Sequence, residues 1–128
     1  MPSQTTAVAR VVIVHDNTSV ADSFSRTLRL EGYEVWAAQS ADEGLTLAQV
    51  HCPNAIILDL RVPLTASLRF LRAVRSAPGL ATIPVAIVTS DYYRDEPQAN
   101  ELQALGAQLH YTPLWLNELV TLARDLVA

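Results

Sequence analysis

Five short runs rich in Val, Ile and Leu recur along this chain, and segments with helical spacing separate them. The runs are apolar without strict alternation, which favours strands that are covered on both faces. They lie near residues 10–15, 33–37, 55–59, 84–89 and 107–111. Because strand and helix alternate, the sequence predicts a parallel sheet with right-handed crossovers and helices on both faces.

The number of strand–helix units decides which parallel architecture the chain can form. A closed barrel needs about eight units, whereas this chain of 128 residues shows only the five runs above. We therefore expect one α/β domain with a flavodoxin-like, doubly wound, five-stranded parallel sheet of order 2-1-3-4-5. We assign residues 1–8 to a flexible N-terminal extension and residues 9–128 to the domain.

The helical segments carry apolar residues at three- and four-residue spacing, which predicts one buried face for each helix. These faces comprise Val20, Phe24 and Leu28; Leu45 and Ala48; Leu68, Leu71 and Val74; Leu102 and Leu105; and Leu119, Leu122, Ala123 and Leu126. Asn17 or Thr18 is suited to cap the first helix, and Ser40 the second.

Charge and composition argue against several classes of protein. The formal net charge is −4, and the basic residues are nine Arg with no Lys. Arg69, Arg72 and Arg75 form a stripe that we interpret as a solvated helix surface, since an acidic chain without interleaved aromatic residues gives no support to nucleic-acid binding. No apolar run approaches the roughly 20 residues of a membrane span. The N-terminus lacks the pattern of a secretory signal, so we expect a cytoplasmic protein.

Polar residues follow two of the predicted strands. His15, Asp16 and Asn17 end the first run, VVIVHDN, and Asp59 ends the third, AIILD. In open sheets of this kind, ligands bind beyond the carboxyl ends of the strands, at the switch point between strands 1 and 3. Although they are distant in sequence, these residues are therefore expected to be neighbours in the fold.

Two carboxylates at one sheet edge repel each other unless a cation or a shared proton lies between them. Asp16 and Asp59 are thus candidates for binding Mg²⁺, which takes one or two carboxylates together with waters and a phosphate. A carboxylate can also act as a nucleophile toward a phosphoryl group. The competing interpretations are a loop cap for Asp59 and, for His15, a hydrogen bond to neighbouring backbone or to Asp59, a switch near neutral pH, or a transition-metal site with Asp16.

The stretches VVIVHDN, LEGYEV, SADEGL, PNAIILDLRVP, IPVAIVTS and GAQLHYTP occur in this order over roughly residues 9–127. Together they resemble the receiver domain of two-component response regulators. The resemblance implies that Asp59 accepts a phosphoryl group from a histidine kinase or phosphotransfer protein, and that Thr89 is the hydroxyl residue that switches the following loop. It also implies that Mg²⁺ is held by Asp16, Asp59 and the backbone carbonyl of Arg61.

The chain departs from the family pattern at two places in the site. His15 replaces the first of the acids that follow strand 1. Thr112 precedes Pro113 where the family has a lysine, and the segment is one residue short, so either Thr112 fills the lysine position or the lysine has been deleted. By the same count, the strand-5 aromatic residue of the family corresponds to Leu109 or to His110.

Loss of one acid together with the lysine leaves two carboxylates, which one bound Mg²⁺ still neutralises. It also removes a cation from the place where charge develops during phosphoryl transfer, a loss that typically costs about 3 kcal/mol, or on the order of a hundredfold in rate. We therefore expect a signalling receiver with weakened phosphoryl acceptance and weak Mg²⁺ binding. We expect no enzyme activity beyond its own phosphoryl transfer and hydrolysis.

Two alternative functions stay open. A phosphorylation-independent pseudo-receiver would act as a protein-interaction module through the face formed by strand 4, helix 4, strand 5 and helix 5, with Tyr92, Tyr93, Leu114 and Trp115 as candidate contacts for an effector domain, a partner protein or a second copy. A flavodoxin-like binder of phosphate or a small ligand would use residues 17–19, although that loop lacks the glycines of the known phosphate-binding fingerprints. The sequence does not identify the kinase or the output.

Overall fold

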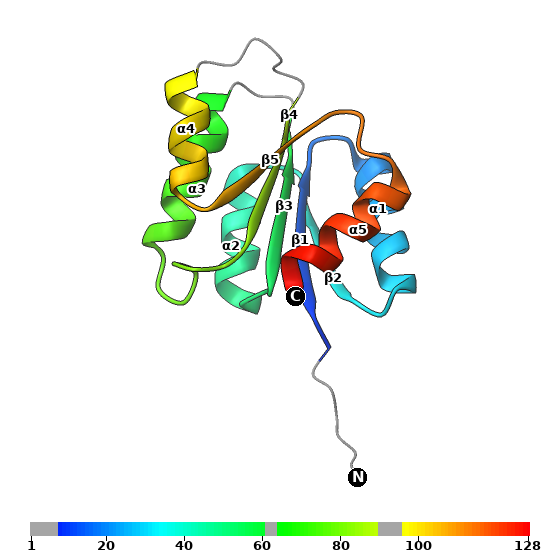
Figure 1. The fold of residues 1–128 in the computed structure, drawn as a ribbon. Helices are drawn as coiled ribbons and strands as arrows, with labels where there is room; N and C mark the ends of the chain where they lie inside the picture. The colour runs from blue at the N-terminus through cyan, green and yellow to red at the C-terminus, as the bar shows by residue number, and fades with distance from the viewer. Residues whose placement is uncertain (1–7, 61–63, 90–95) are drawn as a thin grey trace.

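Five parallel strands form one sheet of order β2-β1-β3-β4-β5 (Figure 1), as the alternation of strand and helix predicts. A computed structural model describes residues 8–60, 64–89 and 96–128. The strands are β1 Arg10–His15, β2 Glu34–Ala38, β3 Ala55–Asp59, β4 Val85–Thr89 and β5 Ala107–Tyr111. The flavodoxin-like fold is therefore confirmed, with strand ends that lie within about one residue of the expected runs.

Helices cover both faces of the sheet, with α1 and α5 on one side and α2, α3 and α4 on the other (Figure 1). The helices are α1 Thr18–Leu30, α2 Ala41–His51, α3 Leu64–Ser76, α4 Glu96–Ala104 and α5 Leu116–Val127. Both predicted caps are confirmed. Asn17 Oδ1 accepts a hydrogen bond from the Val20 N–H at 3.1 Å, and Ser40 Oγ accepts one from the Glu43 N–H at 3.2 Å.

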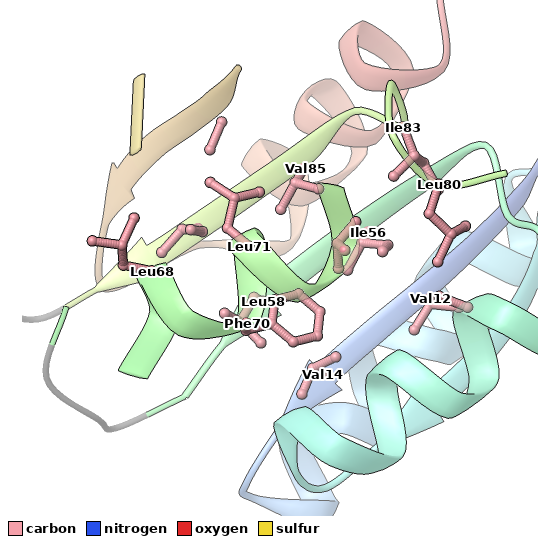
Figure 2. Close-up of a cluster of buried hydrophobic side chains, with 14 of the residues drawn as sticks. Val12, Val14, Ile56, Leu58, Leu68, Phe70, Leu71, Leu80, Ile83 and Val85 are labelled. Carbon is pink, nitrogen blue, oxygen red and sulfur yellow. The ribbon is translucent and has the colours of Figure 1, made fainter. Parts of the chain in front are cut away.

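Alternate residues of the central strands fill two separate hydrophobic clusters. On the α2–α3–α4 side, Val12, Val14, Ile56 and Leu58 pack against Leu71 and its neighbours on α3 (Figure 2). On the α1–α5 side, the intervening residues Val11, Ile13, Ala55 and Ile57 pack against Phe24, Leu28, Leu119, Leu122, Ala123 and Leu126. Because both sets are buried, β3 has no polar residue before Asp59, and β1 has none between Arg10 and His15.

A close approach of α2 to β1 depends on Gly44. A Cβ atom at this position would lie 2.4 Å from Cγ2 of Val14, well inside ordinary contact distance. Gly44 is buried within the helix, so the absence of a side chain lets the helix backbone reach the sheet. This packing positions α2 directly over the first strand.

The arginine stripe on α3 is not a uniform solvated surface, so that interpretation was wrong for one of its members. Arg72 is exposed and pairs with Glu101 on α4. Arg75 is partly buried and donates to the carbonyls of Leu105 and Ile83, each at 2.7 Å. Burial lowers the pKa of Arg75, and the carbonyl contacts satisfy N–H groups on its Nε and Nη1 atoms. Arg75 is therefore a structural residue that joins α3 to the end of α4.

Several predicted features lie outside the described residues. They are the N-terminal extension up to residue 7, Arg61 with its carbonyl, Tyr92 and Tyr93. The domain boundary near residue 8 stays a prediction. Within the described parts of the chain, no helix is long and apolar enough to cross a membrane.

Candidate functional site

The carboxyl ends of β1 and β3 bring His15 and Asp59 together, as the switch-point rule predicts. The two residues face each other in the register of these parallel strands. Both are buried, with exposed fractions of 6% for His15 and 8% for Asp59. The first polar residues after two apolar strands thus meet in one site.

Two contacts select the tautomer of a neutral His15 ring. Its Nδ1 accepts a hydrogen bond from the backbone N–H of Asn17 at 2.9 Å. Its Nε2 lies 3.4 Å from Oδ2 of Asp59. A ring nitrogen that accepts a hydrogen bond carries no proton, so neutral His15 holds its proton on Nε2, facing the carboxylate. The Phe24 and His15 rings pack against each other nearly at right angles, with 5.7 Å between ring centroids.

This geometry bears on the alternatives for His15. The contact with neighbouring backbone is confirmed, and the contact with Asp59 is a close approach of an N–H to a carboxylate. Ligation of a transition metal by Nε2 would require the proton to leave that nitrogen, and the Asn17 N–H blocks its move to Nδ1. The ring is therefore set up as a donor toward Asp59.

Asp16 occupies a different environment from Asp59. Its side chain is 37% exposed, whereas that of Asp59 is 11% exposed. Oδ1 of Asp16 lies 3.6 Å from Nδ1 of His15, so the imidazole contacts both carboxylates. An imidazole at residue 15 adds no negative charge beside these two carboxylates, whereas an acid there would add a third.

The end of β5 brings Thr112 to the same site. The Thr112 N–H donates to the Thr89 carbonyl at 3.0 Å, directly after the last ladder pair, Thr89 with Tyr111. The Thr112–Pro113 peptide bond is cis. Thr112 lies directly after β5 and lines the site, and both alternatives for this segment, a Thr112 that fills the family's lysine position or a deleted lysine, stay predictions.

The register of β5 also separates Leu109 from His110. Leu109 packs against the cluster on the α2–α3–α4 side. His110 faces α5, where its Nε2 lies 3.1 Å from Gln108 Oε1. Burial lowers the pKa of His110, and the negative charge of Glu118 opposes that shift. Leu109 is the residue that the count back from Pro113 selects for the family's aromatic position. It lies on the side of the sheet that faces α4, and it is not aromatic.

His15, Asp59 and Thr112 line a common pocket of about 460 Å³. The other described lining residues are apolar: Val20, Phe24, Leu60, Pro113 and Leu114. Thr89 is buried at the end of β4 and is not part of this lining. Sequence reasoning recognised Phe24 only as a core residue. The signal for its second role was that Val20 and Phe24 lie in the first turns of the helix that starts directly after the site.

The described residues supply only part of a binding site for a divalent ion. Asp16 and Asp59 supply carboxylate oxygens of the kind that Mg²⁺ prefers. The third expected ligand, the carbonyl of Arg61, lies outside the described residues. Among the residues that are described, no group of three His, Cys, Asp or Glu side chains is arranged to hold a metal. An Mg²⁺ ion here would depend on waters and a phosphate for most of its coordination.

Part of the predicted interaction face is apolar and exposed. Trp115 is 63% exposed and Leu116 is 46% exposed at the start of α5. Leu114 is partly buried against the α1–α5 cluster and lines the pocket beside Asp59, so it is less suited to be a surface contact than was expected.

Comparisons with known proteins agree with this architecture. The sequence model of the response regulator receiver domain family matches residues 11–112. The transcriptional regulatory protein PrrA of Mycobacterium tuberculosis is 31% identical over 118 residues, which cover 92% of this chain and 49% of PrrA. Response regulator MprA of a Mycobacterium species is 32% identical over 81 residues, covering 63% of this chain and 34% of MprA. The chain therefore spans about half or less of the length of these relatives.

Solved structures show the same fold. The chemotaxis protein CheY4 of Vibrio cholerae superposes with a TM-score of 0.80 at 28% identity, covering 94% of this chain and 99% of CheY4. A CheY-like receiver domain protein of Methanospirillum hungatei superposes with a TM-score of 0.77 at 26% identity, covering 93% of each chain. With the matched family spanning most of the sequence and the pocket lying where parallel sheets of this order bind ligands, the chain belongs to the response regulator receiver domain family.

Proposed function

We propose that this receiver domain accepts a phosphoryl group on Asp59 from a histidine kinase or phosphotransfer protein, with a lower rate than a receiver that keeps all its charged groups. The observation that carries the proposal is the position of Asp59. It is a buried carboxylate at the end of β3, and it opens into a pocket at the switch point of the sheet.

The chemistry requires one oxygen of Asp59 to form a new bond to phosphorus while the bond between phosphorus and the donor breaks. The donor leaves with that electron pair. Negative charge spreads over the phosphoryl oxygens during transfer, and fixed cations or N–H donors stabilise it. In a neutral His15 ring, the Nε2–H that lies 3.4 Å from Asp59 Oδ2 is a donor without a charge. A neutral N–H stabilises such charge less than a cation does, so slow transfer is expected.

Mg²⁺ belongs to the proposal as a weakly bound ion. Asp16, Asp59 and the Arg61 carbonyl would hold it, and it would neutralise charge on the phosphoryl oxygens. Asp16 is partly exposed to solvent, which weakens its attraction for an ion relative to a buried ligand. Micromolar affinity for Mg²⁺ in a titration followed by NMR at Asp16 would contradict weak binding.

Intact mass spectrometry after incubation with acetyl phosphate and Mg²⁺ tests the proposal directly. A single phosphoryl adduct should form slowly, and Asp59→Asn should abolish it. Asp125→Asn is the matched control, because it removes an exposed carboxylate on α5 and should leave the adduct unchanged. An adduct that persists in Asp59→Asn, or no adduct at any donor concentration, would refute phosphoryl acceptance at this residue.

Restoration of the family residues gives a second test. His15→Asp combined with Thr112→Lys returns an acid to the end of β1 and a cation to the end of β5 within the same pocket. Together the two changes should raise the yield of the adduct more than either change alone, because each restores one charged group of the same site.

A phosphorylation-independent interaction module remains the second candidate function. The exposed Trp115 and Leu116 on α5 favour it, since adjacent exposed apolar side chains suit a protein contact. In this case Trp115→Ala should weaken binding of a partner protein or self-association, while Asp59→Asn should leave either unchanged. If Asp59→Asn instead weakens binding and Trp115→Ala does not, signalling depends on phosphorylation.

A further inference from the structure

A second cavity lies between α1 and the edge strand β2, which run beside each other at one margin of the sheet (Figure 1). The cavity has a volume of about 370 Å³, and its described lining shares no residue with the pocket beside Asp59. The described lining residues are Asp22, Ser25, Arg26, Arg29, Leu30 and Ala37. All except Ala37 belong to α1, so one side of this helix and the edge of the sheet enclose the space.

A buried hydroxyl group in this lining has no hydrogen-bond partner among the described residues. Ser25 is only 3% exposed, and its Oγ atom is left unpaired. A serine within a helix commonly donates to the carbonyl one turn earlier, but Ser25 does not. An unpaired buried hydroxyl costs free energy, so an oxygen acceptor supplied by a ligand would be stabilising.

Two guanidinium groups of the same lining are not paired with any carboxylate in the described parts of the chain. Neither Arg26 nor Arg29 forms an ion pair there, although Asp22 is one helical turn away from Arg26. Arg29 is held in place by a hydrogen bond of 2.8 Å from its Nη2 to the Val35 carbonyl. Two Arg and one Asp give the lining a net charge of +1, which is complementary to a ligand with one negative charge.

The outer edge of β2 completes the cavity with main-chain groups. The Glu34 N–H donates to the Ala9 carbonyl at 3.0 Å, so residue 34 faces the β1 side of the strand. Because alternate residues of a parallel strand bond to the same neighbour, Val35 and Ala37 turn their N–H and C=O groups toward the outer edge of the described sheet. The bond from Arg29 to the Val35 carbonyl agrees with this direction. Ala37 therefore offers the cavity a main-chain N–H as well as a small apolar side chain.

We propose that this cavity binds a small monocarboxylate with a short hydrocarbon chain. The carboxylate would accept hydrogen bonds from the Ser25 hydroxyl, Arg26 and Arg29, and the chain would cover Leu30 and Ala37. The planar guanidinium fork matches the two oxygens of a carboxylate. Exposed side chains change rotamer rapidly, so a ligand that reorders the arginines would gain access to the covered hydroxyl.

Titration of sodium hexanoate into the full chain, followed by amide NMR near neutral pH at constant ionic strength, tests this site. Saturable shifts should appear at Ser25, Arg26 and Ala37. The neutral analogue 1-hexanol should bind at least about tenfold more weakly, because it lacks the charge that the arginines attract. Acetate should also bind more weakly, because it lacks the chain that covers Leu30. Equal binding of hexanoate and either analogue, or shifts that do not saturate, would overturn the proposal.

Matched variants separate the site from general charge effects. Arg26→Gln should weaken hexanoate binding by about tenfold. Arg124→Gln makes the same charge change on the exposed surface of α5 and should leave binding intact. Similar losses of affinity in the two glutamine variants would mean that hexanoate responds only to net charge, and the proposed site would be wrong.

The Ser25 hydroxyl is tested by a variant that distinguishes binding from folding. Ser25→Ala should weaken hexanoate binding by roughly threefold to tenfold, because one hydrogen bond to the ligand is lost. The same change should not lower the midpoint of urea unfolding, since the hydroxyl makes no hydrogen bond within the described residues. Unchanged affinity in Ser25→Ala would refute the assignment of this hydroxyl to the ligand.

The site is independent of phosphoryl acceptance. Asp59→Asn should leave hexanoate binding unchanged, because Asp59 does not belong to this lining. Loss of binding in Asp59→Asn would place the ligand in the other pocket and contradict the proposal. A chain that binds hexanoate but never forms a phosphoryl adduct would refute the proposed function and leave this site standing.

Discussion

Replacement of His15 by Asp should destabilise the metal-free domain and make its stability depend on Mg²⁺. The imidazole lies 3.4 Å from Asp59 and 3.6 Å from Asp16. A carboxylate at residue 15 would put a second negative charge roughly 4–5 Å from Asp59, where Coulomb repulsion at an effective protein dielectric constant amounts to about 3–4 kcal/mol. Repulsion from Asp16 should add less, because that group is partly exposed.

His15→Asn is the control that isolates this charge effect. It removes the ring contact with Phe24 and the Asn17 hydrogen bond in the same way as His15→Asp, but it adds no charge. Urea unfolding in the presence of a chelator should therefore show His15→Asp to be less stable than His15→Asn by a few kcal/mol. Saturating Mg²⁺ should recover much of this difference in His15→Asp and change the wild type little. If the two variants are equally stable without Mg²⁺, the neutral imidazole does not relieve repulsion at this site, and the reasoning fails.

Three further predictions concern the fold around the site. Gly44→Ala should lower the free energy of unfolding by about 1–2 kcal/mol, because overpacking against Val14 outweighs the better helix propensity of Ala. Urea unfolding measures this free energy. The additional change Val14→Ala should make the Gly44→Ala substitution less costly. Arg75→Lys should cost about 1–3 kcal/mol through unpaired carbonyls, whereas Arg69→Lys on the exposed side of α3 should be neutral in the same assay. Burial holds the pKa of His110 below its ordinary value of 6.5, so the unfolded chain binds more protons there and stability should rise as pH increases through the interval below that value. Urea unfolding at several pH values should show a smaller slope for His110→Gln, and an unchanged slope would contradict the assignment.

The strands, their order and the two helix caps were predictable because each has a local cause. Runs such as VVIVH and AIILD are apolar on both faces, and short side chains with a hydrogen-bond acceptor precede α1 and α2. The switch-point rule then placed His15 beside Asp59 without any knowledge of side-chain contacts. Periodicity and capping were sufficient for this part of the structure.

The direction of individual side chains was not predictable in the same way. Arg75 has the same spacing as Arg69 and Arg72, but the turn after α3 and the end of α4 bring carbonyls to it that no local pattern reveals. The ring tautomer of His15 depends on the Asn17 backbone, and the pocket walls depend on how α1 and the segment before α5 converge. These features come from tertiary contacts between segments that are distant in sequence.

The contacts of Arg75 also set a mechanical limit on α4. Its guanidinium group ties the carbonyl of Leu105, just past the last turn of α4, to the carbonyl of Ile83 in the turn that leads into β4. Because Arg72 also pairs with Glu101, α4 is held to α3 at two points toward its carboxyl-terminal end, so displacement should be smallest there and largest at the other end. Any tilting of α4 should therefore be greatest near Glu96 and should fade toward Ala104. Arg75 thus fixes the carboxyl-terminal end of α4 to the segment that leads into β4.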